Sequence, residues 1–145
     1  FYLLHSTNRG VYPKWAELGA YEFIEQKKKE GKIRNIGFSF HADKELLEEI
    51  LSSHHWDFCQ LQINYLDWHN GDAKDLYDLT VKYDVPVMVM EPVRGGYLSA
   101  FAPPVEAPMK ACHPELSVSA WALRWVAMNA WTVPRCALLS CRRPL

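Results

Sequence analysis

Four apolar stretches recur along the chain at short intervals, and this recurrence constrains the fold more than any other feature. They begin near residues 1, 33, 58 and 85, so successive starts are 32, 25 and 27 residues apart. Each is followed by a segment whose apolar residues return at helical spacing or that is rich in good helix formers. Strand followed by helix, repeated at close to the roughly 30 residues of a βαβ unit, predicts a parallel α/β architecture.

The same patterns place the individual elements. We expect strands over residues 1–5, 32–40, 57–66 and 85–92, helices over 13–29, 43–53, 73–83 and 117–130, and a proline-rich loop over 100–108. Pro13 suits the first turn of a helix, Asp43 is a plausible N-cap, and Gly31 is typical of a helix end. The last strand is apolar without interruption, as expected in a parallel sheet that is covered on both faces.

Composition excludes several classes of protein. With 49% hydrophobic and 23% charged residues, the chain of 145 residues can build a core and suits one domain or a piece of a larger one. Its 16 basic and 17 acidic residues give no reason to expect nucleic acid or an anionic membrane as a partner. The sequence contains no apolar run of about 20 residues and no signal peptide, so we expect a cytoplasmic protein.

The cysteines and glycines exclude two further kinds of site. Four cysteines, Cys59, Cys112, Cys136 and Cys141, lack the C-x-x-C spacing of zinc ligands and are expected to be buried thiols. No Gly-x-Gly-x-x-Gly follows a strand, so a Rossmann dinucleotide site has no support.

A (β/α)8 barrel of the TIM type remains, and the chain is short for one. A complete barrel needs eight units and about 250 residues, whereas four units and the start of a fifth are present here. We therefore expect residues 1–145 to form a partial barrel domain, about the second half.

Polar residues at the carboxyl ends of the strands are the candidate functional residues, because barrel chemistry lies at that rim. His5 fits a proton donor, a metal ligand or a structural histidine, and Ser39 fits either a ligand contact or a hydrogen bond to a neighbouring carbonyl. Gln60, Gln62 and Asn64 are spaced two apart, which predicts one shared strand face. Three amides on such a face suit a neutral amide or hydroxyl ligand.

The loop after the fourth strand suits an anionic ligand. Gly95 and Gly96 allow the backbone to approach a ligand closely, and Arg94 is available for a phosphate. Taken alone, this segment is also compatible with an ordinary loop.

Several segments together resemble the aldo/keto reductase family, and in particular its bacterial branch of predicted oxidoreductases. They are YLLHS, EGKIRNIGFSFH, WDFCQLQINYLD, VPVMVMEPVRGG and SAWALRWV, in family order over about residues 1–130. The resemblance implies a (β/α)8 barrel of which strands 4 to 7 and a remnant of strand 8 are present. By the same resemblance, residues 131–145 are a divergent tail. The resemblance also implies an oxidoreductase that reduces aldehydes and ketones with NADP(H), or NAD(H), at a tetrad of Asp, Tyr, Lys and His.

The resemblance assigns roles to individual residues. His5 would be the tetrad histidine that orients the carbonyl oxygen, whereas the other tetrad residues belong to earlier strands. Ser39 and Gln60 would contact the nicotinamide carboxamide, although the usual Asn after that serine is Phe40 here. The remaining cofactor-binding positions lie near the pyrophosphate and are Glu91, Pro92, Val93, Arg94 and Gly95.

Two other functions compete with carbonyl reduction. A non-catalytic nucleotide-sensing or scaffold barrel subunit fits the missing tetrad positions. A metal-dependent hydrolase would need several ligands at the strand ends, and only His5, His41 and Glu91 are available there, so we expect no metal. Arg142 and Arg143 suit a 2′-phosphate by charge, but nothing else in the tail supports that role.

Half a barrel exposes two strand edges and an inner face, which predicts self-association or poor solubility of residues 1–145 expressed alone. Size-exclusion chromatography with light scattering, run over a series of concentrations, would show species larger than the monomer. A monomer that melts sharply and cooperatively in dilute solution would contradict this expectation.

Overall fold

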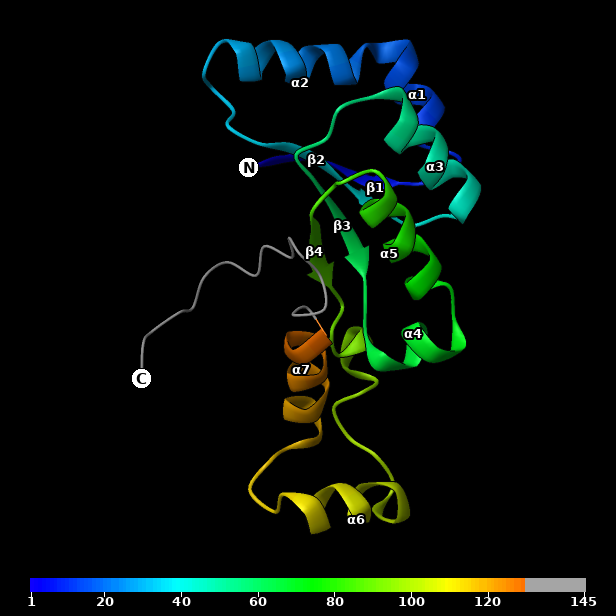
Figure 1. Ribbon diagram of the computed structural model, residues 1–145, viewed down its shortest axis with the longest axis vertical. Coiled ribbons are helices and arrows are strands. Elements are labelled where there is room, and N and C mark those ends of the chain that lie inside the picture. The colour runs from blue at the N-terminus through cyan, green and yellow to red at the C-terminus, as the bar shows by residue number, and fades with distance from the viewer. Residues whose placement is uncertain (130–145) are drawn as a thin grey trace.

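The computed structural model describes residues 1–129, which form one parallel sheet with helices between its strands (Figure 1). The strand order in the sheet, β1-β2-β3-β4, is the order along the chain. The strands are β1 Tyr2–Thr7, β2 Ile36–Phe40, β3 Phe58–Gln62 and β4 Val87–Met90. Each neighbouring pair is parallel, which confirms the predicted alternating α/β architecture.

The helices return the chain between parallel strands and extend it beyond β4. They are α1 Tyr12–Leu18, α2 Ala20–Lys29, α3 Lys44–Ser53, α4 Tyr65–Asn70, α5 Ala73–Lys82, α6 Pro103–Cys112 and α7 Val118–Asn129, with a 3-10 turn η1 at Arg94–Gly96. Within residues 1–129, no helix is long and apolar enough to cross a membrane.

The hydrophobic core lies on one face of the sheet. Alternate residues of β2 and β3, among them Phe38 and Leu61, pack with Ile24 of α2, Leu47 of α3 and Leu76 of α5. Figure 1 shows α3 and α5 on the same side of the strands. Because side chains alternate across a strand, the intervening residues point to the opposite face. That face carries the candidate polar residues.

Helix caps follow the local sequence. The Asp43 side chain accepts a hydrogen bond from the Leu46 N–H at 3.1 Å, so it is the N-cap of α3, as predicted. The segment expected as one helix over 13–29 is two helices, because Gly19 takes a left-handed conformation (φ 61°) that ends α1.

Several other boundaries differ from expectation. β2 begins at Ile36 instead of residue 32, and β4 spans only Val87–Met90 of the expected 85–92. The first strand continues past residue 5 to Thr7. The third ends at Gln62, because Asn64 caps α4 instead of extending the strand. The stretch expected as a proline-rich loop over 100–108 contains the start of α6, whose first turn holds proline, a residue that this position tolerates well.

The cysteines behave differently from one another. Cys59 is fully buried, and burial raises the pKa of its thiol well above the ordinary value. Cys112 is exposed at the end of α6, so its expected burial is wrong. Cys136 and Cys141, like the predicted tail at 131–145, lie outside the described residues.

Gly37 of β2 provides a test of the packing between β2 and β3. A Cβ atom at this position would lie 2.5 Å from the Phe58 carbonyl oxygen and 2.7 Å from the Phe58 ring. Because a strand backbone cannot move aside cheaply, we expect Gly37→Ala to lower the free energy of unfolding by about 1–3 kcal/mol. Urea denaturation followed by tryptophan fluorescence measures this change.

Gly10→Ala is the matched control, since the nearest atom to its added Cβ would be Asn8 Oδ1 at 3.4 Å. We expect this variant to unfold close to the wild-type midpoint. Equal midpoints for the Gly37 and Gly10 variants would contradict the close approach of β2 and β3.

Candidate functional site

The carboxyl ends of the four strands meet at one rim of the sheet, because the strands are parallel and adjacent (Figure 1). Backbone strain concentrates there. Four non-glycine residues among the described ones have positive φ, and three of them, Ser6, Glu91 and Arg94, lie at or just after the carboxyl ends of β1 and β4. Such conformations are unfavourable for L-residues and cluster at functional sites. The rim is therefore the candidate site.

His5 and Ser39 join β1 to β2 at this rim. The His5 Nδ1 atom lies 3.0 Å from Ser39 Oγ, and the Ser6 N–H donates to the same Oγ at 2.8 Å. A register shift between Leu4 and Thr7 accompanies these contacts. Ser39 has no exposed surface, whereas His5 is exposed. Ser39 thus holds His5 in place. The predicted contact of Ser39 with a nicotinamide carboxamide stays a prediction.

Gln60 lies next to Ser39 across the sheet. The two residues are paired in the β2–β3 register, and Gln60 is in turn paired with Met88 of β4. Its side chain is half-buried and forms no hydrogen bond to another residue in the range 1–129. An amide of this kind can both donate to and accept from a ligand amide.

Gln62 shares a strand face with Gln60, as the spacing predicted, because both belong to β3 and lie two residues apart. Asn64 does not share that face. Asn64 is buried beyond the end of β3, where its Oδ1 accepts from the Asp67 N–H at 2.9 Å as the N-cap of α4. The side-chain amides of Gln62 and Asn64 both donate to Asp67 Oδ2 at 2.7 Å. Of the three amides, Gln60 alone makes no contact with Asp67.

Asp67 connects the ends of β3 and β4, a role that sequence reasoning missed. Its Oδ1 accepts from Arg94 Nε at 2.9 Å. Burial by itself raises the pKa of Asp67, but hydrogen bonds from Gln62 and Asn64 and the charge of Arg94 lower it below the ordinary value. Asp67 is therefore held as a carboxylate. The Asn-x-x-Asp spacing from Asn64, which resembles a capping box, was the available signal.

The loop after β4 is closed by its own side chains. The Glu91 carboxylate accepts from the Gly95 N–H, and the Arg94 guanidinium lies 5.6 Å from the centre of the Tyr97 ring. Pro92 and Val93, between them, are partly buried. Both groups expected to meet a phosphate, the Arg94 side chain and the Gly95 N–H, thus have a carboxylate partner within the chain.

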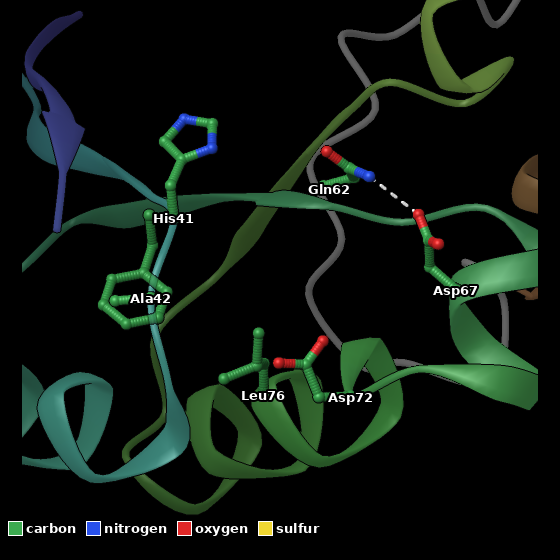
Figure 2. Close-up of a pocket in the computed structure, with 7 residues that line it drawn as sticks. His41, Ala42, Gln62, Asp67, Asp72 and Leu76 are labelled. Atoms are coloured by element: carbon green, nitrogen blue, oxygen red, sulfur yellow. Dashed lines mark hydrogen bonds between the residues drawn. The ribbon is translucent and has the colours of Figure 1, made fainter.

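A pocket of about 270 Å³ lies beside these residues, between the ends of β2 and β3 and the start of α5 (Figure 2). It is lined by Phe40, His41, Ala42, Gln62, Asp67, Asp72 and Leu76. Figure 2 shows the Gln62 amide directed toward Asp67 along the rim, with Leu76 and Asp72 on the helix side. Neither His5 nor Gln60 lines this pocket.

Within residues 1–129, no group of three or more His, Cys, Asp or Glu side chains is placed to hold a metal ion. Arg142 and Arg143 lie outside the described residues.

Comparison with known proteins gives one match. Residues 2–125 match the sequence model of the Aldo/keto reductase family. No curated protein and no solved structure matches the chain.

The ion pair between Arg9 and Asp43 links the loop after β1 to the N-cap of α3. The pKa of Asp43 tests whether this contact forms. Two nitrogens of Arg9 donate to the two carboxylate oxygens of Asp43, each at 2.5 Å. These hydrogen bonds lower the pKa of Asp43 from 3.8 to about 2. In Arg9→Gln we expect this pKa to rise toward 3.8, as measured by NMR titration of the carboxyl carbon.

The stability linked to this pair follows from the sign of the shift. Because the folded pKa is below the unfolded one, the stabilisation is present above pH 3.8 and is lost as the pH falls toward 2. The difference in urea midpoint between wild type and Arg9→Gln should therefore shrink over that range. Lys14→Gln, which removes an exposed cation of α1, serves as the control. An Asp43 pKa that is the same in all three chains would contradict the pairing.

Proposed function

This chain belongs to the aldo/keto reductase family, and we propose that it forms part of a barrel that reduces small aldehydes or ketones with NADPH or NADH. The observation that carries the proposal is the row formed by His5, Ser39 and Gln60 across β1, β2 and β3. This row places an exposed imidazole and an unengaged amide on the same face of the sheet, at the rim where barrel chemistry occurs.

The proposal extends to the place of these strands in a complete barrel. We propose that β1 to β4 correspond to strands 4 to 7 of eight, in the bacterial oxidoreductase branch, and that residues 131–145 are a divergent tail of the same domain. Support comes from the sequential strand order and from the core, which lies on the helix-covered face. Both features are expected of a segment of barrel wall.

His5 would act on the substrate carbonyl through Nε2. Ser39 Oγ accepts from the Ser6 N–H, so its own hydroxyl proton can be donated to His5 Nδ1. We assign the His5 proton to Nε2 on this basis, because a neutral imidazole with Nδ1 as acceptor carries its proton on the other nitrogen. That Nε2–H can donate a hydrogen bond to a carbonyl oxygen and polarise it.

The chain offers a free side chain to the carboxamide of a nicotinamide cofactor, but the groups that suit its phosphates are already hydrogen-bonded. Gln60 suits the carboxamide, since its amide is accessible and makes no hydrogen bond to another described residue. Arg94 and the Gly95 N–H suit phosphates chemically, but Asp67 and Glu91 already engage them. When bound, the cofactor supplies the hydride. The residues of this chain orient the carboxamide and polarise the carbonyl.

Protonation of the alkoxide requires an acid that the proposed roles do not include. Of the family's Asp, Tyr, Lys and His, we assign only the histidine in this sequence. General acid catalysis contributes about 10²–10⁴-fold to rate, so we expect residues 1–145 alone to reduce carbonyls far more slowly than an ordinary enzyme. Reduction of a test aldehyde with NADPH at ordinary enzyme rates would contradict this expectation.

Cofactor binding tests the proposed role of Gln60. The chain contains six tryptophans, so quenching of their fluorescence by NADPH measures binding. Replacing Gln60 by Ala removes hydrogen bonds worth about 0.5–1.5 kcal/mol each, and we expect the affinity to fall roughly 5- to 20-fold. Gln26→Ala, at an exposed position of α2, should bind NADPH like the wild type. Equal affinities for the Gln60 variant and the wild type would sink the assignment.

A further inference from the structure

We propose that Glu91 is an internal anion that occupies the Gly95 N–H and determines how strongly the loop after β4 binds phosphate-bearing ligands. The inference rests on the proposed function, which places a dinucleotide cofactor at the carboxyl ends of the strands. It goes further by assigning Glu91 a selective role that opposes anion binding.

The loop geometry leaves the Gly95 N–H without a loop carbonyl as its acceptor. Three consecutive residues have positive φ: Arg94 at 50°, Gly95 at 59° and Gly96 at 91°. Glu91, three residues before Arg94, also has positive φ, at 55°. Val93 (φ −108°, ψ 8°) precedes the left-handed Arg94, and a turn of this kind directs successive N–H groups to one side, where they can bind an anion. The loop N–H groups that donate to loop carbonyls are those of Arg94, Gly96, Tyr97, Leu98 and Ser99.

The Gly95 N–H differs from these groups because its acceptor is a side chain, the Glu91 carboxylate. A carboxylate is the chain's own substitute for a phosphate oxygen, since both are anionic acceptors. Glu91 is exposed, so its side chain has room to leave the loop when a stronger acceptor arrives. The contact is therefore a reversible one, in which a ligand must displace the glutamate.

The charges around the loop reinforce this competition. Arg94 is the cation of the loop, and Asp67 engages it at 2.9 Å. Asp67 is itself held by Gln62 and Asn64, so it cannot readily turn away from Arg94. Within residues 1–129, Glu91 forms no salt bridge, and the neighbouring Arg94 pairs with Asp67 instead. A phosphate arriving at Gly95 thus meets an uncompensated negative charge, whose repulsion falls with distance and with salt.

Glutamate at position 91 also has an unfavourable backbone conformation. A glutamate at φ 55° is strained, because its Cβ crowds the backbone in the left-handed region. The hydrogen bond from its side chain to the Gly95 N–H offsets part of this cost. The strained residue thus engages a loop donor that is suited to an anionic ligand.

The test compares binding of inorganic pyrophosphate by four versions of the full chain. Glu91→Gln keeps an acceptor for the Gly95 N–H but removes the charge, and Glu91→Ala removes both. Glu22→Gln makes the same charge change at an exposed position of α2 and serves as the control. Isothermal titration calorimetry at low ionic strength measures the affinity, and urea denaturation shows that each variant is folded.

We expect both Glu91 variants to bind pyrophosphate at least about tenfold more tightly than the wild type, with the larger gain in Glu91→Ala. The Glu22 variant should match the wild type. If either Glu91 variant is folded and binds no more tightly than the wild type, the proposal is overturned, and this includes the case in which neither chain binds at all. A gain of the same size in Glu22→Gln would also overturn it, because the effect would then come from net charge.

Titration with NADPH separates this inference from the proposed function. Tighter pyrophosphate binding by the Glu91 variants, with no NADPH binding by any chain, supports the role of Glu91 and overturns the proposed function. NADPH binding by all four chains, with equal pyrophosphate affinities, supports the proposed function and overturns the role of Glu91.

Discussion

Burial of β2 on both faces is the constraint on which the rest of the structure depends. Every residue of this strand is buried. On one face Phe38 packs into the core formed with the helices. On the other face the Phe58 ring occupies the space that a side chain at Gly37 would need. Ser39 continues that second face and holds His5. A strand with so little freedom positions the strands on either side of it, so the rim geometry follows from the packing of the strand interior.

Carboxylates determine the chemical character of the rim. Asp43 ties the loop after β1 to α3, Asp67 ties β3 to the loop after β4, and Glu91 closes that loop. Asp67 and Glu91 accept from Arg94 and the Gly95 N–H, two donors that suit an anionic ligand chemically. The rim therefore resembles an anion site whose donors are already satisfied, with a neutral amide at Gln60 beside it. Such an arrangement favours neutral groups and makes anions compete for their place.

The local sequence predicted much of the scaffold. The apolar strands, their parallel arrangement, the Asp43 cap and the strand-end positions of His5 and Ser39 all followed from spacing and residue type. Some element boundaries could not be predicted from apolar spacing, because local capping residues and prolines set them. The break at Gly19, the early end of β3 and the start of α6 each depend on a cap or a proline at a position that periodicity does not weigh.

Residue order and type are enough to specify that this chain alternates strand and helix, belongs with the aldo/keto reductases and places polar residues where parallel strands end. These properties are carried by periodicity and by short motifs, which are local. The hydrogen-bond partners of these polar residues become known only from the folded chain. Ser39 contacts His5, 34 positions earlier in the chain, and Arg94 contacts Asp67, 27 positions earlier. The Gln60 side chain forms no hydrogen bond with any of these four residues. Hydrogen bonds of this kind depend on register and loop conformation, and residue type alone does not specify either.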